Sequence, residues 1–275
     1  MRLLFCGDLV GRAGRAVVTE MLPRLRRDLA LDFVVVNGEN AAGGFGITEQ
    51  ICQQLHGAGA DVITTGNHVW DQKGTVEFID RQPRLLRPEN FPAGTPGRGF
   101  GLFRTTDGRR VLVMNVMGRL FMDAMDDPFA VALDRLAGCR LGEQADAILV
   151  DFHAEATSEK QAFGYHLDGK VSAVVGSHTH VPTADARILP GGTAFMTDAG
   201  MCGDYESVIG MTRTVPVQRF TRKLPTERMT PAEGPATLCG LFIETDDRTG
   251  LARRALPIRQ GGILAPELPP GSSAA

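Results

Sequence analysis

The feature that most constrains this chain is a series of short apolar runs, most of them rich in β-branched residues. The runs cover residues 3–6, 33–36, 61–65, 111–116, 147–150 and 171–175. Continuous apolar runs of this length are typical of strands that are buried on both faces of a sheet. Helical spacing at residues 16–29, and at 49–55 after the N-cap residue Thr48, separates the first three runs. The pattern therefore predicts an α/β protein.

The last third of the chain follows a different pattern of short strands and glycine turns. Residues 238–244, followed by a turn at 246–250, predict a hairpin in a second, more antiparallel sheet. The segment 213–233 carries three prolines and four arginines and is predicted to be an excursion or a loop. We expect one domain over residues 1–261 and a mobile tail over residues 262–275, which are rich in Pro, Gly, Ser and Ala.

Composition excludes several classes of protein. The formal net charge of -3 favours neither nucleic acid nor an anionic membrane, so RNA stays open as a partner only through a local basic patch. The N-terminal apolar run is too short for a signal peptide, and no apolar stretch of about eighteen residues predicts a membrane span. Five scattered cysteines without a CxxC pair favour reduced thiols in a cytoplasmic protein over a disulfide framework or a zinc ribbon.

Polar residues collect directly after five of the predicted strands. In chain order these groups are Gly7-Asp8, Gly38-Glu39-Asn40, Gly66-Asn67-His68, Asp151-Phe152-His153 and Gly176-Ser177-His178-Thr179-His180. Ligands of α/β sheets bind beyond the carboxyl ends of the strands, so we expect these groups to converge at one edge. Four groups begin with glycine, which lets the backbone turn and lets a ligand approach closely.

Considered singly, each polar residue has a structural alternative. Asp8 could cap a helix, Asn40 could stabilise a turn, and His153 could be a hydrogen-bonded core histidine. Two carboxylates, two amides and four histidines at one sheet edge would nevertheless be costly to bury without a cation. This mixture of donors suits iron, manganese or zinc, and it is too large for one ion. His56 and His166 lack such a context and are expected to be structural.

His178 and His180 are separated by a single residue. Residues i and i+2 of an extended segment share a side, so a strand that continues past Val175 could present both imidazoles to one cavity. A polar turn after the strand is the structural alternative. The histidine pair therefore supports a metal site without establishing it.

In their order along the chain, these groups resemble the motifs of the calcineurin-like metallophosphoesterases. Members of that superfamily commonly carry DxH, GDxx, GNHE or GNHD, a single histidine, and GHxH. The corresponding segments of this chain run from Asp8 to His180 in the same order, and Gly66-Asn67-His68 and the segment 176–180 are the most specific of them.

Three positions depart from the common superfamily pattern. Val10 stands where a histidine is usual, Glu39 where most members have an aspartate, and Val69 where many have an acidic residue. With these departures, the chain resembles the YmdB-type branch over nearly its whole length. The segments that carry this resemblance are residues 38–48, 64–71 and 197–210.

The resemblance implies a four-layer αββα sandwich with mixed sheets and a hydrolase that opens the phosphodiester bond of 2′,3′-cyclic nucleotides. The implied ligands are Asp8, Glu39, Asn40 and His180 for one ion, and Glu39, Asn67, His153 and His178 for the other. Glu39 would bridge the ions, and Asn40 would supply the oxygen that replaces a histidine at Val10. The implied ions are iron first, with manganese or zinc as alternatives, and a hydroxide between them would attack phosphorus.

His68 follows Asn67 directly and is expected to protonate the leaving ribose oxygen as a general acid, the alternative being a supporting hydrogen bond. Contacts to the rest of the substrate stay unassigned. Arg12, Thr48, Asn115 and Arg119 are candidates, but each is equally explained as a surface or packing residue. Assembly into a homo-oligomer is left open.

Three other functions compete with this interpretation. A dinucleotide-binding turn would need GxGxxG, whereas residues 7–14 have the spacing GxxxGxxG, and such a turn leaves the histidines unexplained. A regulatory protein could keep the metal fold with weak or no catalysis. A phosphatase or nuclease of the same superfamily would share the same donor set.

Overall fold

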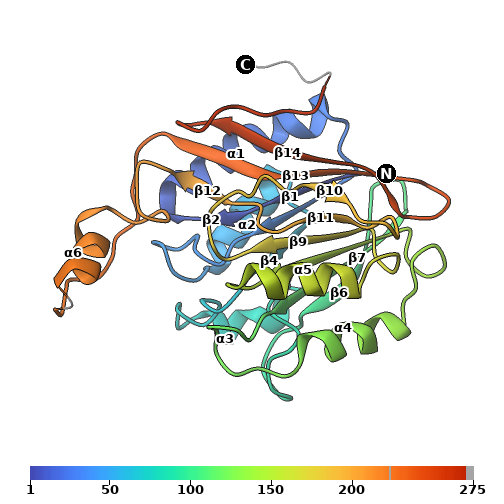
Figure 1. The fold of residues 1–275 in the computed structure, drawn as a ribbon, viewed down its shortest axis with the longest axis horizontal. Helices are drawn as coiled ribbons and strands as arrows, with labels where there is room; N and C mark the ends of the chain where they lie inside the picture. Colours follow the sequence, from blue (N-terminus) through green and yellow to red (C-terminus); the bar gives the residue numbers. More distant parts are fainter. Residues whose placement is uncertain (223, 271–275) are drawn as a thin grey trace.

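The computed structural model describes residues 1–222 and 224–270, which form two β-sheets and six α-helices (Figure 1). The first sheet has the order β2 (Asp8–Leu9), β12 (Met201–Asp204), β13 (Ala236–Thr245), β1 (Arg2–Cys6), β3 (Phe33–Asn37), β4 (Val62–Thr64) and β5 (Leu85–Leu86), with β14 (Ala252–Gly261) also paired to β13. The second sheet has the order β10 (Arg187–Ile188), β11 (Ala194–Met196), β9 (Ala173–Ser177), β8 (Ala147–His153), β7 (Arg110–Met117) and β6 (Phe100–Arg104). The helices are α1 (Gly11–Asp28), α2 (Glu49–Ala58), α3 (Thr75–Phe78), α4 (Pro128–Ala137), α5 (Thr157–His166) and α6 (Thr214–Arg222).

Both sheets are mixed. β1 is parallel to β3 and antiparallel to β13, and β3, β4 and β5 continue the parallel part. In the second sheet β7, β8, β9 and β11 are parallel, while β6 and β10 pair antiparallel at the two edges. All residues of β3 and of β8 are buried, as their continuous apolar runs require. The prediction of an α/β protein with mixed sheets is confirmed.

Alternation of side chains along the strands separates three apolar clusters. Leu4 and Cys6 of β1 pack toward α1 and α2, whereas Leu3 and Phe5 face the second sheet. The side chains that the two sheets bury between them come from β1 and β3 on one side and from β7, β8 and β9 on the other. The outer face of the second sheet packs against α4 and α5, which lie in the lower part of Figure 1. Each sheet is therefore covered on both faces, and the strand ends of both sheets are available to one site.

The structure corrects three expectations for the chain path. The hairpin β13–β14 does not start a second sheet, because β13 pairs with β1 and extends the first one. The segment 213–233 is not all loop: it contains the helix α6, which projects from the body of the fold (Figure 1) and whose Pro216 lies in the first turn, where a proline is tolerated. β8 continues to His153 because β7 and β9 pair with it that far, so Asp151 lies within the strand and not after it.

The C-terminal segment is described only in part. Residues 271–275 of the expected tail lie outside the described residues. Within the described part, Glu267 exchanges two backbone hydrogen bonds with Arg259 of β14, at 2.8 and 2.9 Å. The division at residue 261 stays a prediction. None of the helices in the described residues combines the length and the apolarity that a membrane span would need.

Two glycines, one in the second sheet and one on a helix surface, allow us to test how tightly the chain packs around β9. A Cβ at Gly176 in β9 would overlap the backbone carbonyl of Thr197, whereas a Cβ at Gly57 on α2 would meet open space. We predict that Gly176→Ala lowers the free energy of unfolding by about 1–3 kcal/mol. Gly57→Ala should raise it by roughly 0.5–1 kcal/mol, because alanine favours a helix interior. Denaturant titration of both variants tests this, and equal effects would contradict it.

Candidate metal centre

Both sheets deliver the predicted ligands to one place. Asp8 lies in β2, Glu39 and Asn40 follow β3, Asn67 follows β4, His153 ends β8, and His178 and His180 follow β9. Two sets of three among these residues have ligand atoms that all lie within 4.8 Å of one another. The sets are Glu39, His153 and His178, and Asp8, Glu39 and His180. Glu39 belongs to both sets, so the geometry offers two adjacent sites that share one carboxylate.

The donor atoms of the first set converge on the Nε2 atom of His153. That atom lies 3.2 Å from Glu39 Oε2, 3.1 Å from His178 Nδ1 and 3.0 Å from Asn67 Oδ1. One imidazole nitrogen has at most one proton, so it cannot satisfy three such neighbours. Gly66 makes room for this convergence, because a Cβ there would overlap both the Glu39 carboxylate and the His153 ring.

The side-chain amide of Asn40 contacts two members of the second set, Glu39 and His180. Its Nδ2 donates to Glu39 Oε1 at 3.0 Å and lies 3.1 Å from His180 Nε2. Its Oδ1 is buried and has no hydrogen-bond partner. A half-turn of the amide exchanges the two atoms and brings the oxygen to the side of Glu39 and His180.

Unpaired buried acceptors test whether these residues fit a cation. Asp8 is fully buried, and its Oδ1 has no hydrogen-bond partner, like Oδ1 of Asn40. Buried polar atoms in folded proteins almost always have a partner, so the unpaired carboxylate oxygen of Asp8 needs an explanation. A cation would satisfy it, and the donor set therefore fits a metal site.

The electrostatics of the cluster indicate the same need for positive charge. Burial raises the pKa of Asp8 to about 7, although His180 and His153 oppose the shift. Burial also acts to raise the pKa of Glu39, but the charge and hydrogen bond of His153 outweigh it and hold that pKa below its usual range. Burial and the neighbouring His153 lower the pKa of His178 to about 3, which keeps its imidazole neutral, the form that binds a metal.

A buried hydrogen-bond chain fixes the ring of His153. Its Nδ1 lies 2.9 Å from Ser177 Oγ, and Ser177 donates to Asp151 Oδ1 at 2.6 Å. The other oxygen of Asp151 accepts from the hydroxyl of Thr64 and also from the amides of Asn37 and Asn115. With Nδ1 engaged in this way, Nε2 is left to face the other donors.

The two histidines after β9 do not continue the strand, so the expected extended geometry is wrong. β9 ends at Ser177, and the backbone φ angles of His178 and His180 are +99° and +65°. Left-handed backbone is costly for residues other than glycine and persists only where the surroundings enforce it. Each imidazole is oriented by this loop and not by strand alternation.

Lys160 and Asp198 form the buried ion pair that enforces the loop. Both side chains are 1 % exposed, and Lys160 Nζ donates to Asp198 Oδ2 at 2.6 Å and to the carbonyl of Ser177 at 2.7 Å. The same carboxylate oxygen accepts from the backbone nitrogen of Thr179 at 3.0 Å and from its hydroxyl at 2.8 Å. The loop is thus fixed on both sides of His178.

His68 lies beside the donor cluster and is 31 % exposed. Its Nδ1 is 2.9 Å from Asp71 Oδ2, and the edge of its ring meets Phe45, with the ring centroids 5.1 Å apart. Its backbone nitrogen donates to Glu39 Oε2 at 3.4 Å. These contacts orient the imidazole at the rim of the centre, where a substrate can reach it.

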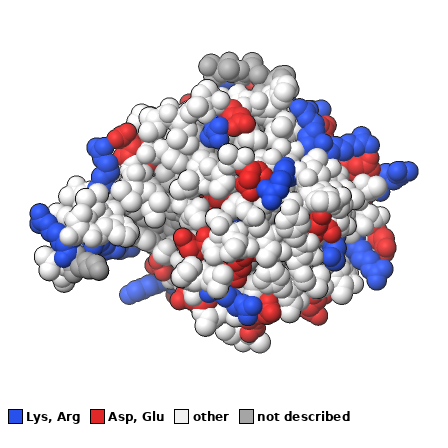
Figure 2. All heavy atoms as spheres, in the orientation of Figure 1, with Lys and Arg blue, Asp and Glu red and all other residues white. Residues whose placement is uncertain are grey.

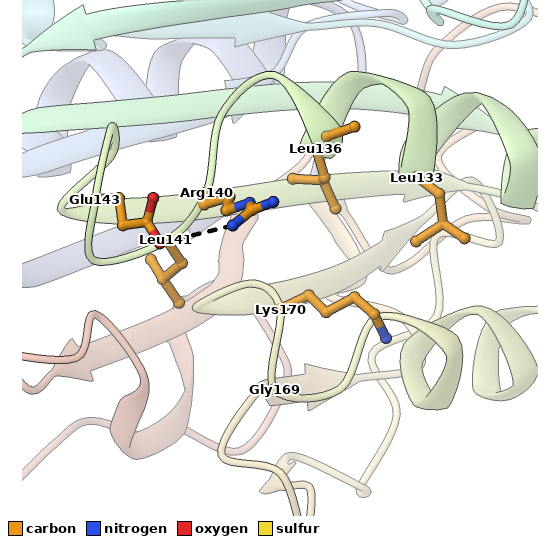
Figure 3. A pocket seen from close by; sticks show the side chains of 8 residues that line it. Leu133, Leu136, Arg140, Leu141, Glu143, Gly169 and Lys170 are labelled. Carbon is orange, nitrogen blue, oxygen red and sulfur yellow. Dashed lines mark ion pairs between the residues drawn. The ribbon is translucent and has the colours of Figure 1, made fainter.

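A cavity of about 240 Å³ opens onto the cluster. Its lining includes Glu39, Asn40, His68, His178 and His180 together with Phe45, Glu155, Thr179, Ile209, Met211 and Met229. A different hollow, shown in Figure 3, is about 370 Å³ in volume and lies between α4 and the turn before β9. Its charged residues Arg140 and Glu143 are exposed and pair with each other at 3.9 Å. We therefore assign the candidate site to the smaller cavity, because the predicted metal donors line it and do not line the larger one.

Several residues of the cluster were missed by the sequence analysis. Asp71 and Asp198 lie inside segments that carried the family resemblance, and their acidic side chains were the available signal. Lys160 had no such signal, because it is one lysine on the otherwise ordinary helix α5. Glu155, 3.2 Å from His178 Nε2, and Asp151 were visible only as neighbours of His153.

The unassigned candidates for substrate contact have structural partners. Arg12 pairs with Glu233, Arg119 lies 3.6 Å from Asp127, and Thr48 caps α2. Asn115 donates to Asp151 at 3.1 Å, beneath the cluster. The two histidines that were expected to be structural lie apart from the donor sets: His56 contacts the carbonyl of Ala60, and His166 packs on Phe129.

Fold and site together define an α/β protein with a candidate centre for two metal ions at the meeting edges of its sheets. Comparison with known families matches residues 4–258 to the model described as YmdB-like protein. The chain belongs to this family.

Named relatives agree with this assignment. The chain is 50% identical, over 90% of its length and 93% of the relative's, to the 2′,3′-cyclic-nucleotide 2′-phosphodiesterase of Bacillus subtilis (strain 168). Among solved structures, a hypothetical protein from Thermus thermophilus is 42% identical with a TM-score of 0.88, covering 95% of this chain and 100% of that one. A novel phosphatase from Mycoplasma pneumoniae is 33% identical with a TM-score of 0.88, covering 98% of this chain and 95% of that one.

The ion pair beneath the histidine loop generates a stability prediction. Lys160→Met leaves Asp198 buried without its cation and should lower the free energy of unfolding by about 3–5 kcal/mol. Arg213→Gln, which removes an exposed pair with Glu206, is the matched control and should cost less than about 1 kcal/mol. Urea titration compares the two variants, and a Lys160→Met cost no larger than that of the control would contradict the role of the pair.

Proposed function

We propose that the chain is a metal-dependent phosphodiesterase that hydrolyses 2′,3′-cyclic nucleotides at a dinuclear centre. The observation that carries the proposal is the Glu39 carboxylate, which belongs to both sets of converging donors. The activity in the name of the Bacillus subtilis relative supports the choice of substrate. The separate apolar clusters on the two faces of each sheet support the four-layer αββα arrangement that this superfamily uses.

In this proposal the chain holds its two ions with neutral imidazoles, carboxylates and amide oxygens. Asp8, Glu39, Asn40 and His180 would hold one ion, and Glu39, Asn67, His153 and His178 the other, with iron, manganese or zinc as the metals that suit such donors. When bound, two adjacent ions supply an acidified water for attack on phosphorus and positive charge that stabilises the phosphate oxygens.

The residues around the donors supply the rest of the chemistry. His68, at the cavity rim, would give a proton to the ribose oxygen as the ester bond breaks. Asp71 accepts from His68 Nδ1 at 2.9 Å, which would leave Nε2 to carry that proton. His153 would be oriented through Ser177 and Asp151, so that the ligand geometry is set before substrate binds.

A long nucleic acid is less well supported as the substrate. On the face shown in Figure 2, Lys and Arg side chains lie among Asp and Glu, with basic residues both toward α6 at the left and along the right edge. Nucleic-acid binding at useful affinity depends on neutralising many phosphates along a continuous basic track. A small cyclic phosphodiester needs no such track.

Metal content tests the centre itself. We predict about two transition-metal ions per chain in protein prepared without chelators. Asp8→Ala, Asn40→Ala and His178→Ala should each lower the occupancy, because each removes a donor atom. His166→Ala, away from the donor sets, is the control and should keep the wild-type content. Elemental analysis measures all four variants, and metal-free wild-type protein after supplementation would refute the proposal.

The role of His68 is tested by varying the leaving group. His68→Ala should keep its metal and lose about 1.4–4 kcal/mol of transition-state stabilisation on a 2′,3′-cyclic nucleotide, which is about tenfold to a thousandfold in rate. The loss should be smaller on a p-nitrophenyl phosphodiester, whose leaving group needs little protonation. Asp71→Asn should show the same contrast in weaker form. Equal losses on both substrates would leave His68 as a structural residue.

A further inference from the structure

The cavity at the metal centre has two chemically different walls. One wall consists of the donor residues, and the other, which we call the apolar wall, consists of Phe45, Ile209, Met211 and Met229. A ligand whose phosphate reaches Glu39 and Asn40 can place the remainder of its structure in contact with the apolar wall. The proposed function gives this wall no role.

The apolar wall is the outer surface of a small packed cluster. Val10, Met201 and Met211 are buried together, and Phe45 and Met229 pack against them. Val10 stands at the position where the common superfamily pattern has a histidine. An apolar side chain there continues the cluster to the edge of the centre, so the wall is firmly supported.

Ile209 lines the apolar wall with its backbone in a strained, left-handed conformation. Its φ angle is +47°, in the left-handed region that β-branched residues avoid, yet its side chain is 53% exposed. In this conformation its carbonyl accepts from His180 Nδ1 at 2.8 Å. Strain of this kind persists where it serves a site. One residue thus orients a donor imidazole and presents an apolar side chain at the cavity mouth.

Phe45 adds a flat aromatic ring to the wall. The guanidinium carbon of Arg228 lies over this ring, 5.5 Å from its centroid. Bases of single nucleotides are bound in this way, by stacking on aromatic side chains and on arginine planes.

We infer that the apolar wall is a nucleobase subsite, formed by Phe45, Met229 and Ile209. The base of a nucleoside 2′,3′-cyclic phosphate lies on this wall while its phosphate lies at the donor wall. The inference rests on the proposed function and adds to it a specificity for nucleosides.

The test compares kcat/KM for adenosine 2′,3′-cyclic phosphate with that for the 2,3-cyclic phosphate of 1-O-methylribose, which has no base. The wild-type enzyme should prefer the nucleotide. Phe45→Ala and Met229→Ala should each lower this preference by about tenfold, because base stacking is lost. Phe45→Tyr keeps the ring and should keep the preference. Leu102→Ala, an exposed apolar truncation on β6, is the control and should leave the preference unchanged.

Binding of adenosine to the metal-loaded protein, measured by calorimetry, provides a second readout that needs no turnover. Met229→Ala should weaken this binding by about tenfold, with metal content unchanged. If both cyclic phosphates are hydrolysed equally well, the base subsite is overturned while the proposed function stands. If neither is hydrolysed, the proposed function fails, and adenosine binding that depends on Met229 still supports the subsite. Adenosine that does not bind overturns it.

Discussion

The structure depends on one buried carboxylate, that of Glu39, which lies where the ends of the two sheets meet. It contacts His153 from the second sheet at 3.2 Å and Asn40 at 3.0 Å, and it belongs to both sets of converging donors. Burying an anion beside another acid is unfavourable unless positive charge is present. Gly66, which precedes Asn67, leaves the space that the Glu39 carboxylate and the His153 ring occupy. The site therefore needs positive charge near Glu39 as well as space for its carboxylate.

The surrounding protein makes the donor positions rigid. The donor side chains at strand ends are held in place because the two sheets are rigid, with apolar residues buried between them. Where the chain leaves the strand, as it does after Ser177, buried ion pairing replaces strand pairing: Lys160 and Asp198 hold the loop in a conformation it would otherwise avoid. Preorganised ligands of this kind do not have to be ordered when a metal or substrate binds.

Sequence patterns predicted the strands and the convergence of their ends, because buried runs and glycine-polar steps are local features. They did not predict Lys160 beneath the histidine loop, because its ion-pair partner Asp198 lies 38 residues away along the chain. They also misplaced the histidines on an extended strand, because a left-handed backbone at His178 and His180 depends on tertiary contacts. The prolines of the segment 213–233 indicated an excursion or a loop, although the first turn of a helix accepts proline, as α6 does at Pro216. The metal ligands and the role of His68 stay predictions.

The central claim is that Glu39 is shared by two ions, and the metal content of Glu39→Gln tests it most directly. Glutamine keeps the size of the side chain but removes the charge and one of the two anionic oxygens, so a shared ligand should be lost to both sites together. The account predicts that wild-type protein holds about two ions per chain and that Glu39→Gln, still folded by circular dichroism, holds fewer than about one. A folded Glu39→Gln protein that retains the wild-type metal content would contradict the account.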